Sequence, residues 1–448
     1  MKTSAKSIDL TKGSIWKGLI LFMLPLLFGD LFQQFYNLAD SIIVGQHLGK
    51  QALAAVGSTS TLTNAIIGLF LGFSVGAGVI ISQAFGAKDP NRLSRAIHTT
   101  LTITFLSGVL FTGLGLLLSS FLIRAIKAPA DVYDGALLYI RIYFSGLAGL
   151  IVYNMGSGIL RSIGDSKTPT IALVFSSLLN IVLDLLMVMA LGWGIAGAAI
   201  ATVLTQFLSA AFVLVRIARI PPEYAFRVKK LSIDPAIALS ILRLGLPIGL
   251  QRMITQYSNL IVHSYINSFG STHMAGWTIY NRIHELAILP MENFGSATTT
   301  FTGQNRGAKD KKRVQEGIWK SAALSILVTM GISVLLYLFA PFLAARFNAD
   351  PAVIEAGTMF TRLLCPLFFM SSISRTYAGA VRGLGDSRGP MILMLVGYVA
   401  TRQLYLAIGT RFVNTPIFIA WAYPMGWIVS SLLIFAYYHI QKKRLLDF

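Results

Sequence analysis

An internal repeat of about 221 residues is the feature that most constrains this chain. The tetrapeptide Gly-Ala-Lys-Asp at 86–89 recurs at 307–310, and the nonapeptide at 161–169 recurs in similar form at 382–390. Nearly all of the sequence between these marks is apolar. Two tandem copies of a hydrophobic unit of this size are typical of membrane carriers, whose substrate path lies between the copies.

The composition excludes a large soluble domain. The chain is 55% hydrophobic and only 12% charged, whereas soluble domains carry about 25% charged residues. We therefore expect a multispan membrane protein. The single cysteine, Cys365, rules out internal disulfides and any multi-cysteine metal site.

Each copy holds six apolar segments long enough to cross a bilayer. We expect an all-α polytopic fold of twelve transmembrane helices in two parallel six-helix lobes, since an even number per copy gives both copies the same orientation. The expected spans are 17–45, 53–82, 95–122, 132–160, 169–192, 195–219, 240–268, 275–303, 317–343, 353–380, 390–412 and 416–440.

Basic residues set the expected orientation. With a cytoplasmic N-terminus, 26 of the 37 lysines and arginines fall in cytoplasmic segments and five on the other side, which predicts a plasma (cell inner) membrane protein with both termini in the cytoplasm. This distribution accounts for the net charge of +19 without a nucleic-acid partner. The polar stretch 220–238 reads as a cytoplasmic linker between an N-terminal lobe, 1–219, and a C-terminal lobe, 239–448.

The repeated loops do not read as nucleotide sites. The chain has no G-x-x-x-x-G-K-[ST] motif, so an ATP-driven pump or other enzyme is not expected. We expect both pairs of repeated loops to be tight turns with capped helix ends.

Two aspartates stand inside apolar spans of the first copy. Asp40 shares one helical face with Tyr36 and Asn37, and Asp184 shares one with Asn180. Thr202 and Gln206 lie one turn apart in the sixth span. The neighbours are hydroxyls and amides rather than cations. A carboxylate in such a site holds its proton more tightly than one in water, and two close together would share a proton.

This pattern has two interpretations. It favours a proton-coupling site, and the alternative is a polar structural knot joining spans 1, 5 and 6. The second copy keeps the scaffold but loses these groups, which favours a function confined to the first half. The replacements are Val262 for Asp40, Thr401 for Asn180, Tyr405 for Asp184 and Tyr423 for Thr202.

The second copy carries its own embedded charges, namely Arg252, His263, Arg282, Glu285, Glu292, Arg375 and Arg402. We interpret them as an ion-pair network joining spans 7, 8, 10 and 11, in which Glu285 balances Arg282. The alternative is a basic lining for an anionic or lipid-phosphate substrate. His263 alone indicates no metal site, and no ligand cluster for a transition metal is evident.

The spans, the repeated loops and the first-copy polar set resemble the multidrug and toxic compound extrusion (MATE) family, and more closely its DinF-like branch. The resemblance covers nearly the whole chain. It implies two six-helix lobes around a central cavity, and export of organic cations against inward flow of protons or sodium. NorM-like members use acids in spans 7 and 10, which read Thr255-Gln256-Tyr257-Ser258 and Met370-Ser371-Ser372 here, so a second-lobe sodium site is not expected.

The resemblance implies roles for individual residues. The cation-coupling set would be Asp40, Asn180, Asp184, Thr202 and Tyr36. The substrate-binding set would be Asp40, Asn37, Gln34, Asn154, Met155 and Gln206. We expect a proton-coupled antiporter that exports amphipathic, often cationic drugs, acts as a monomer in the lipid bilayer and needs no cofactor beyond its coupling ion.

Three alternatives remain open at this point. Hydroxyl and amide oxygens around two carboxylates would also suit Na⁺. The arginines Arg252, Arg282, Arg375 and Arg402 motivate a lipid-linked precursor flippase of the wider superfamily. A membrane scaffold without transport is a third possibility, against which the one-sided acid set argues.

Overall fold

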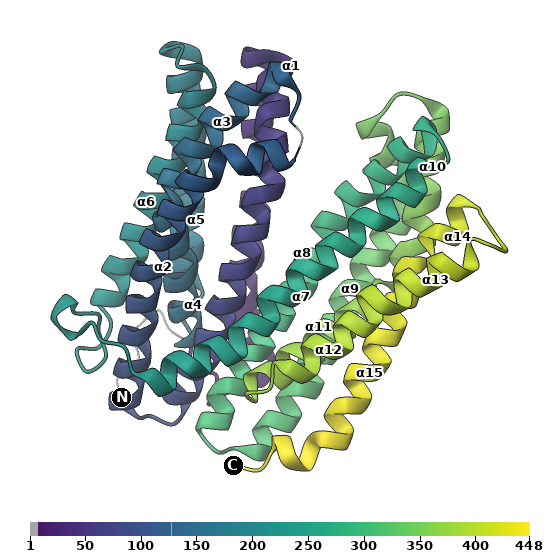
Figure 1. The fold of residues 1–448 in the computed structure, drawn as a ribbon. Coiled ribbons are helices and arrows are strands. Elements are labelled where there is room, and N and C mark those ends of the chain that lie inside the picture. The colour runs from purple at the N-terminus through teal and green to yellow at the C-terminus, as the bar shows by residue number, and fades with distance from the viewer. Residues whose placement is uncertain (1–7, 127) are drawn as a thin grey trace. The chain divides into compact units, whose positions relative to one another are not determined.

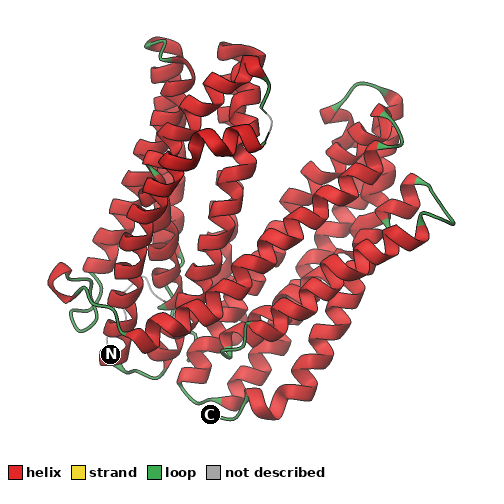
Figure 2. Ribbon diagram, viewed as in Figure 1, coloured by secondary structure: helices red, strands yellow, loops and turns green. Residues whose placement is uncertain are grey.

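The computed structural model is built of helices joined by short loops, with no strand among the residues it describes, 8–126 and 128–448 (Figures 1 and 2). The side chains of residues 60–62, 64 and 65 are also outside the description. Lys2 and Lys6, in the expected cytoplasmic N-terminus, fall within residues 1–7 and are likewise outside it. The all-α fold class is confirmed.

The first copy of the repeat forms six α-helices and one π-helix. Its elements are α1 (Ile15–Gly86), α2 (Pro90–Ala125), α3 (Ala130–Ser145), α4 (Leu147–Ser162), α5 (Lys167–Asp184), the π-helix η1 (Leu185–Ala190) and α6 (Gly194–Ala218). Helix α6 packs against α3, α4 and α5, and α2 packs against α3 and α4. A short 3₁₀ helix, η2 (Val228–Lys230), lies in the connector to the second copy.

The second copy is divided into more pieces. Its elements are α7 (Pro235–Asn267), α8 (Ser271–Gly307), α9 (Lys311–Phe347), α10 (Pro351–Leu364), η3 (Cys365–Leu367), α11 (Phe368–Gly383), α12 (Arg388–Leu395), η4 (Val396–Thr401), α13 (Arg402–Gly409), α14 (Pro416–Ala420) and α15 (Ala422–Leu445). Helix α8 packs against α9, α10 and α11, and α15 packs against α11 and η4.

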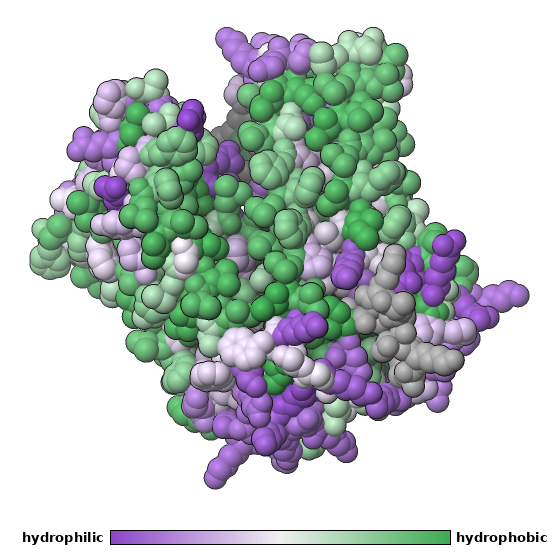
Figure 3. All heavy atoms as spheres, turned by 180° about the vertical axis from the view of Figure 1, so that it is seen from behind, coloured by the Kyte–Doolittle hydropathy of each residue, from purple (hydrophilic) through white to green (hydrophobic). Residues whose placement is uncertain are grey.

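Ten helices of the described chain are long and apolar enough to span a membrane, and the bent pair α3 and α4, with a 49° bend, makes an eleventh. These match eleven of the twelve expected spans. The remaining expected span, 275–303, lies in α8, which has 37 residues but is interrupted by charged side chains. Figure 3 shows one face of this surface, with hydrophobic residues over most of its middle and hydrophilic residues mainly at its upper and lower ends.

The backbone reproduces the sequence repeat. Gly49 breaks α1 with a φ of 80°, and Gly270, 221 residues later, has a φ of 91° before α8. Lys88 and Lys309 also share a positive φ, 53° and 58°. Since a positive φ is costly for residues other than glycine, its recurrence at equivalent positions shows that the two copies share these turns.

The repeated loops are capped turns, as expected. Arg92 N donates to the Asp89 carboxylate at 2.9 Å, and Arg313 N donates to Asp310 at 2.8 Å. Each aspartate therefore satisfies one of the amide donors that every helix leaves free at its N-terminus.

The second pair of repeated loops is anchored twice. Thr168 N donates to Asp165 Oδ1 at 3.0 Å, and Arg216 Nε donates to Asp165 Oδ2 at 3.0 Å. In the other copy, Asp386 accepts hydrogen bonds from Gly389 N at 3.0 Å and from the Tyr437 hydroxyl at 2.5 Å. These aspartates cap a helix and tie its loop to the last helix of the same copy, which is a structural role.

The chain forms two compact units. One consists of Met1–Asp9 and Leu24–Gly249, and the other of Leu10–Met23 and Leu250–Phe448. The division therefore falls inside α7 rather than at the linker 220–238, and a short N-terminal segment groups with the second unit. Each unit has its own hydrophobic core, centred on residues such as Phe144 and Ile151 in the first and Trp277 and Phe360 in the second.

Candidate functional site

The two aspartates singled out in the sequence meet in the first unit. The carboxyl groups of Asp40, on α1, and Asp184, at the end of α5, lie within hydrogen-bonding reach of each other. No arginine, lysine or histidine is among the groups that act on either carboxyl. Asp184 is fully buried. Both carboxylates are acceptors only, so their contact is a hydrogen bond only when one of them carries a proton.

The local backbone brings Asp184 into this position. Asp184 ends α5, and the π-helix η1 follows it directly; π-helical turns are frequent at functional sites. Helix α6 approaches η1 closely because Gly197 has no side chain, and a Cβ there would lie 3.1 Å from the Met187 backbone. Small residues at the start of α6 thus allow the acid, its helix and Thr202 to converge.

Several buried oxygen atoms in and around the aspartate pair accept no hydrogen bond. Asn180 Nδ2 donates to Thr205 Oγ1 at 3.4 Å, while Asn180 Oδ1 has no partner. Both oxygens of Asp184 and Oε1 of Gln206 are also buried without a donor. Buried oxygens of this kind are costly unless a proton or a cation satisfies them.

Three tyrosines complete the cluster, and two of them were not predicted. The Tyr36 hydroxyl contacts Thr202, as the sequence pattern allowed. Tyr139 and Tyr143, one turn apart on α3, stack with centroids 6.2 Å apart. Tyr143 contacts the Gln206 side chain. Tyr139 lies close enough to Asp40 and Asp184 to interact electrostatically with both. Their spacing of four residues in an apolar span was the signal available in the sequence.

The remaining predicted substrate residues are spread over the first unit. Asn37 is exposed and Gln34 is half-buried on α1. Asn154 Nδ2 donates to its own helix at Leu150 O, 2.9 Å away. Met155 is only 2% exposed and belongs to the hydrophobic core. The structure thus brings Gln206 to the acid cluster but places Met155 among packing residues.

In the second unit, the acid at the centre of the ion pairs is Glu292 rather than Glu285. Arg252 Nη2 donates to Glu292 Oε2 at 3.1 Å, and Arg375 Nη1 donates to Glu292 Oε1. The expected pair of Arg282 and Glu285 forms at 3.2 Å, but its side chains are 64% and 53% exposed and it stands apart. The predicted pairing of Glu285 with Arg282 is thus confirmed, but an exposed pair contributes only about 0–1 kcal/mol, and the shared ion pairs centre on Glu292.

Arg402 joins spans without an acid. Its Nη1 donates to Asn259 Oδ1 at 2.6 Å, and its guanidinium lies 4.0 Å from the Tyr423 ring centroid. The side chain is 1% exposed. Span 11 is thus linked to span 7 by a hydrogen bond to an uncharged amide and to span 12 by a cation–π contact, rather than by an ion pair.

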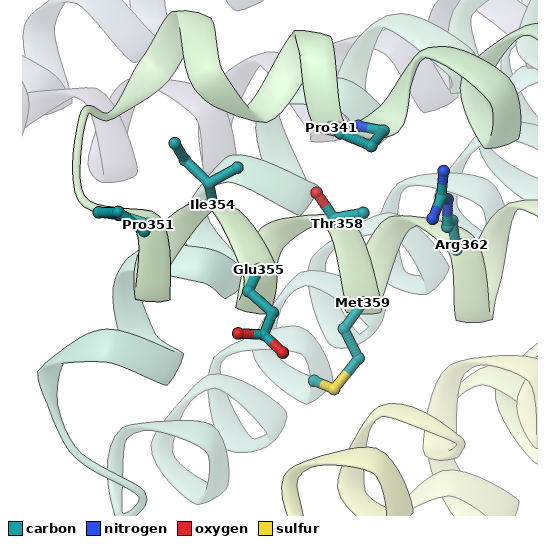
Figure 4. A pocket seen from close by; sticks show the side chains of 7 residues that line it. All are labelled: Pro341, Pro351, Ile354, Glu355, Thr358, Met359 and Arg362. Atoms are coloured by element: carbon teal, nitrogen blue, oxygen red, sulfur yellow. The ribbon is translucent and has the colours of Figure 1, made fainter.

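Among the described residues, neither a metal-ligand group nor either of two cavities coincides with the acid cluster of Asp40 and Asp184. Within the described residues no group of three or more His, Cys, Asp or Glu side chains could hold a metal ion, and His263 lies 3.4 Å from the Asn281 amide. A cavity of about 440 Å³ lies between α9 and α10, lined by residues that include Pro341, Ile354 and Arg362 (Figure 4). A second, of about 330 Å³, lies beside His98 on α2. Neither includes a residue of the acid cluster.

The MatE family model matches residues 25–186 and 247–403. A protein named "Probable multidrug resistance protein YpnP" from Bacillus subtilis is 29% identical over 98% of both chains. A protein named "FAD transporter" from Shewanella oneidensis is 23% identical over 90% of this chain and 89% of its own.

A solved structure agrees over the whole chain. It is a MOP superfamily transporter from Pyrococcus furiosus, described by the reverse polarity of its binding pocket, with a TM-score of 0.92, 25% identity and 100% coverage of both chains. The matched family model spans most of both copies of the repeat. The chain therefore belongs to the MatE (MATE) family of multipass membrane transporters and is a multidrug-efflux-type carrier rather than an enzyme.

Proposed function

We propose that this protein is a proton-coupled antiporter that exports amphipathic, often cationic compounds across the plasma membrane. The observation that carries the proposal is the close approach of Asp40 and Asp184, with no basic side chain among the groups that act on either carboxyl. A proton is the smallest group that turns this contact between two acceptors into a hydrogen bond.

The coupling follows from charge. With one shared proton the pair carries a single negative charge, and without it two. A cationic substrate binds better to the doubly charged form, because opposite charges in a low-dielectric site attract strongly. Proton binding therefore weakens cation binding and the reverse, which allows one to be exchanged for the other.

The polar residues around the pair divide into two groups in this proposal. Asp40, Asn180, Asp184, Thr202 and Tyr36 form the coupling set, supported by their proximity in the first unit. Substrate would contact Asp40 together with Asn37, Gln34, Asn154, Met155 and Gln206. The burial of Met155 makes it the member of this set with least support.

Orientation and assembly belong to the same proposal. The distribution of lysines and arginines supports cytoplasmic termini, and a monomer in the bilayer without a resident cofactor suffices for the cycle described. Placement in the DinF-like branch is supported by the first-copy acids and by the lack of acids at the NorM-type positions of spans 7 and 10.

Transport in proteoliposomes with separately imposed pH and Na⁺ gradients tests the coupling. We expect export of rhodamine 123, a monovalent cation, to follow the pH gradient and to stop in Asp40→Asn, which fixes a neutral, proton-like state. Asp134→Asn is the matched control, since Asp134 is exposed on α3. Full active transport by Asp40→Asn would refute the proposal.

Two alternatives are decided by the same system. Stimulation by an Na⁺ gradient at zero pH gradient would identify a sodium-coupled exporter, since a bound Na⁺ could also satisfy the unpartnered oxygens of the cluster. The arginines around Glu292 favour the second alternative, a lipid-linked precursor flippase. Rescue of a flippase-deficient strain, without export of rhodamine 123, would establish that function instead.

A further inference from the structure

A group of arginines in the second unit carries more positive charge than the acid beside it neutralises. Arg252 and Arg375 share one carboxylate, that of Glu292. Arg382 lies near enough to both arginines to be repelled by them. Within the described residues these two pairs with Glu292 are the only ion pairs of the three guanidinium groups. Three positive charges thus meet one negative charge.

The arginine cluster, defined as Arg252, Arg375 and Arg382 with Glu292, faces water rather than lipid. Arg252 lies near the middle of α7, a candidate span of 33 residues. The side chains of Arg252 and Glu292 are 39% and 35% exposed. A charge facing lipid at such depth costs about 2.5–3.5 kcal/mol or more, so these exposed portions are expected to line an aqueous surface.

Arg375 and Arg382 are also held by hydrogen bonds to uncharged side chains, which do not neutralise their positive charge. Arg375 Nε donates to Ser371 Oγ at 3.2 Å, and Arg382 Nη2 donates to Gln251 Oε1 at 2.7 Å. Arg382 Nε is buried without a partner. Fixed guanidinium groups with spare donors bind carboxylate and phosphate groups in bidentate fashion.

Glu292 shows how an anion fits this cluster. Its two oxygens are divided between the two arginines, Oε2 on Arg252 and Oε1 on Arg375. Each arginine therefore uses only part of its donor set on Glu292. A second carboxylate or a phosphate could take the remaining donors and offset the excess positive charge.

We propose that the arginine cluster binds the anionic group, a carboxylate or phosphate, of an amphipathic substrate. The inference rests on the proposed export function and narrows it. Compounds that carry both a cationic ring system and an acidic group are bound in preference to purely cationic compounds of the same shape.

Rhodamine 110 and rhodamine 123 test this proposal, because the second is the methyl ester of the first. Binding of each to the full chain in phosphatidylcholine nanodiscs is measured by fluorescence polarisation at neutral pH. We expect rhodamine 110 to bind wild type at least tenfold more tightly. Arg375→Gln should weaken rhodamine 110 at least tenfold and change rhodamine 123 by less than twofold, which also shows that the variant is folded.

Two further variants sharpen the test. Arg282→Gln is the matched control, because Arg282 is an exposed arginine outside the cluster, and it should leave both affinities unchanged. Glu292→Gln removes the competing carboxylate and should tighten rhodamine 110 binding. Arg252→Gln replaces Arg375→Gln if the latter does not fold.

Equal affinity of wild type for the two dyes, or equal weakening of both by Arg375→Gln, would overturn the proposal. Rhodamine 110 binding could be present in phosphatidylcholine nanodiscs but lost in phosphatidylglycerol nanodiscs. This result would support the anion site and identify a lipid headgroup as the group that occupies it. Selective binding of rhodamine 110 without export driven by a pH gradient would retain the anion site and reject the export function, so the two failures are distinguishable.

Discussion

Sharing of one proton by Asp40 and Asp184 predicts which driving force the carrier can use. Their carboxyl groups lie within hydrogen-bonding reach of each other, so two protons at once, or none, are less favourable than one. We therefore expect one proton to enter in each cycle. When a monovalent cation leaves in exchange, no net charge crosses the membrane.

The expected magnitudes follow from this stoichiometry. One pH unit is worth about 1.4 kcal/mol per proton, or tenfold accumulation. A potential of 100 mV contributes about 2.3 kcal/mol per charge moved, or roughly 50-fold. Export of rhodamine 123 should thus gain about tenfold per pH unit and hardly respond to potential. Export of rhodamine 110, which is neutral overall, should respond to both.

Proteoliposomes clamped with valinomycin and potassium separate the two forces. The pH gradient is varied at zero potential, and the potential is then varied at zero pH gradient, for wild type and for Asp184→Asn. The variant should lose the response to pH. Strong stimulation of rhodamine 123 export by potential alone would mean that two protons move per cycle, and would refute the shared-proton reasoning.

Three further outcomes are expected. The double variant Asp40→Asn with Asp184→Asn should lose little more transport than either single variant, because groups of one network are not additive; additive losses would argue for separate sites. Glu292→Ala should lower the free energy of unfolding by about 1–3 kcal/mol and Glu285→Ala by less than about 1 kcal/mol, since only the first removes a shared partner of two arginines; thermal unfolding in detergent compares them. Gly49→Ala should cost about 1–3 kcal/mol of stability, because Gly49 has φ 80° and ψ −176°. Nothing lies within 4 Å of the added Cβ, so this cost is backbone strain alone, and an unchanged melting temperature would contradict it.

The fold and the acid pair could be predicted because they depend on short-range patterns. Apolar length determines spans, and eleven of the twelve expected spans match candidate membrane helices. Asp40 and Asp184 stood out because a carboxylate is costly in an apolar helix. Nothing beyond periodicity and the repeat was needed to place these residues together in one unit.

The partners contributed by other helices could not be predicted in the same way. Glu285 and Glu292 are seven residues apart on one helical face, so spacing alone gives no reason to choose between them. The choice depends on arginines of α7 and α11 that reach only Glu292. Tyr139 was missed for a similar reason, since its helix ends in the bend before α4 and the direction of that bend is a property of the packed structure.

The repeat separates what serves folding from what serves function. Positions that recur with the same backbone, such as Gly49 and Gly270 or Lys88 and Lys309, lie in turns. Arg382 recurs as Arg161, but Asp40 and Asp184 of the first copy and Arg375 and Glu292 of the second have no charged counterpart. The first copy keeps two acids without a cation, and the second keeps three arginines around one acid. A structural need shared by both copies would have preserved the same groups in each. The opposite charges therefore fit two different binding roles: the first copy suits a proton or a cation, and the second suits an anionic group.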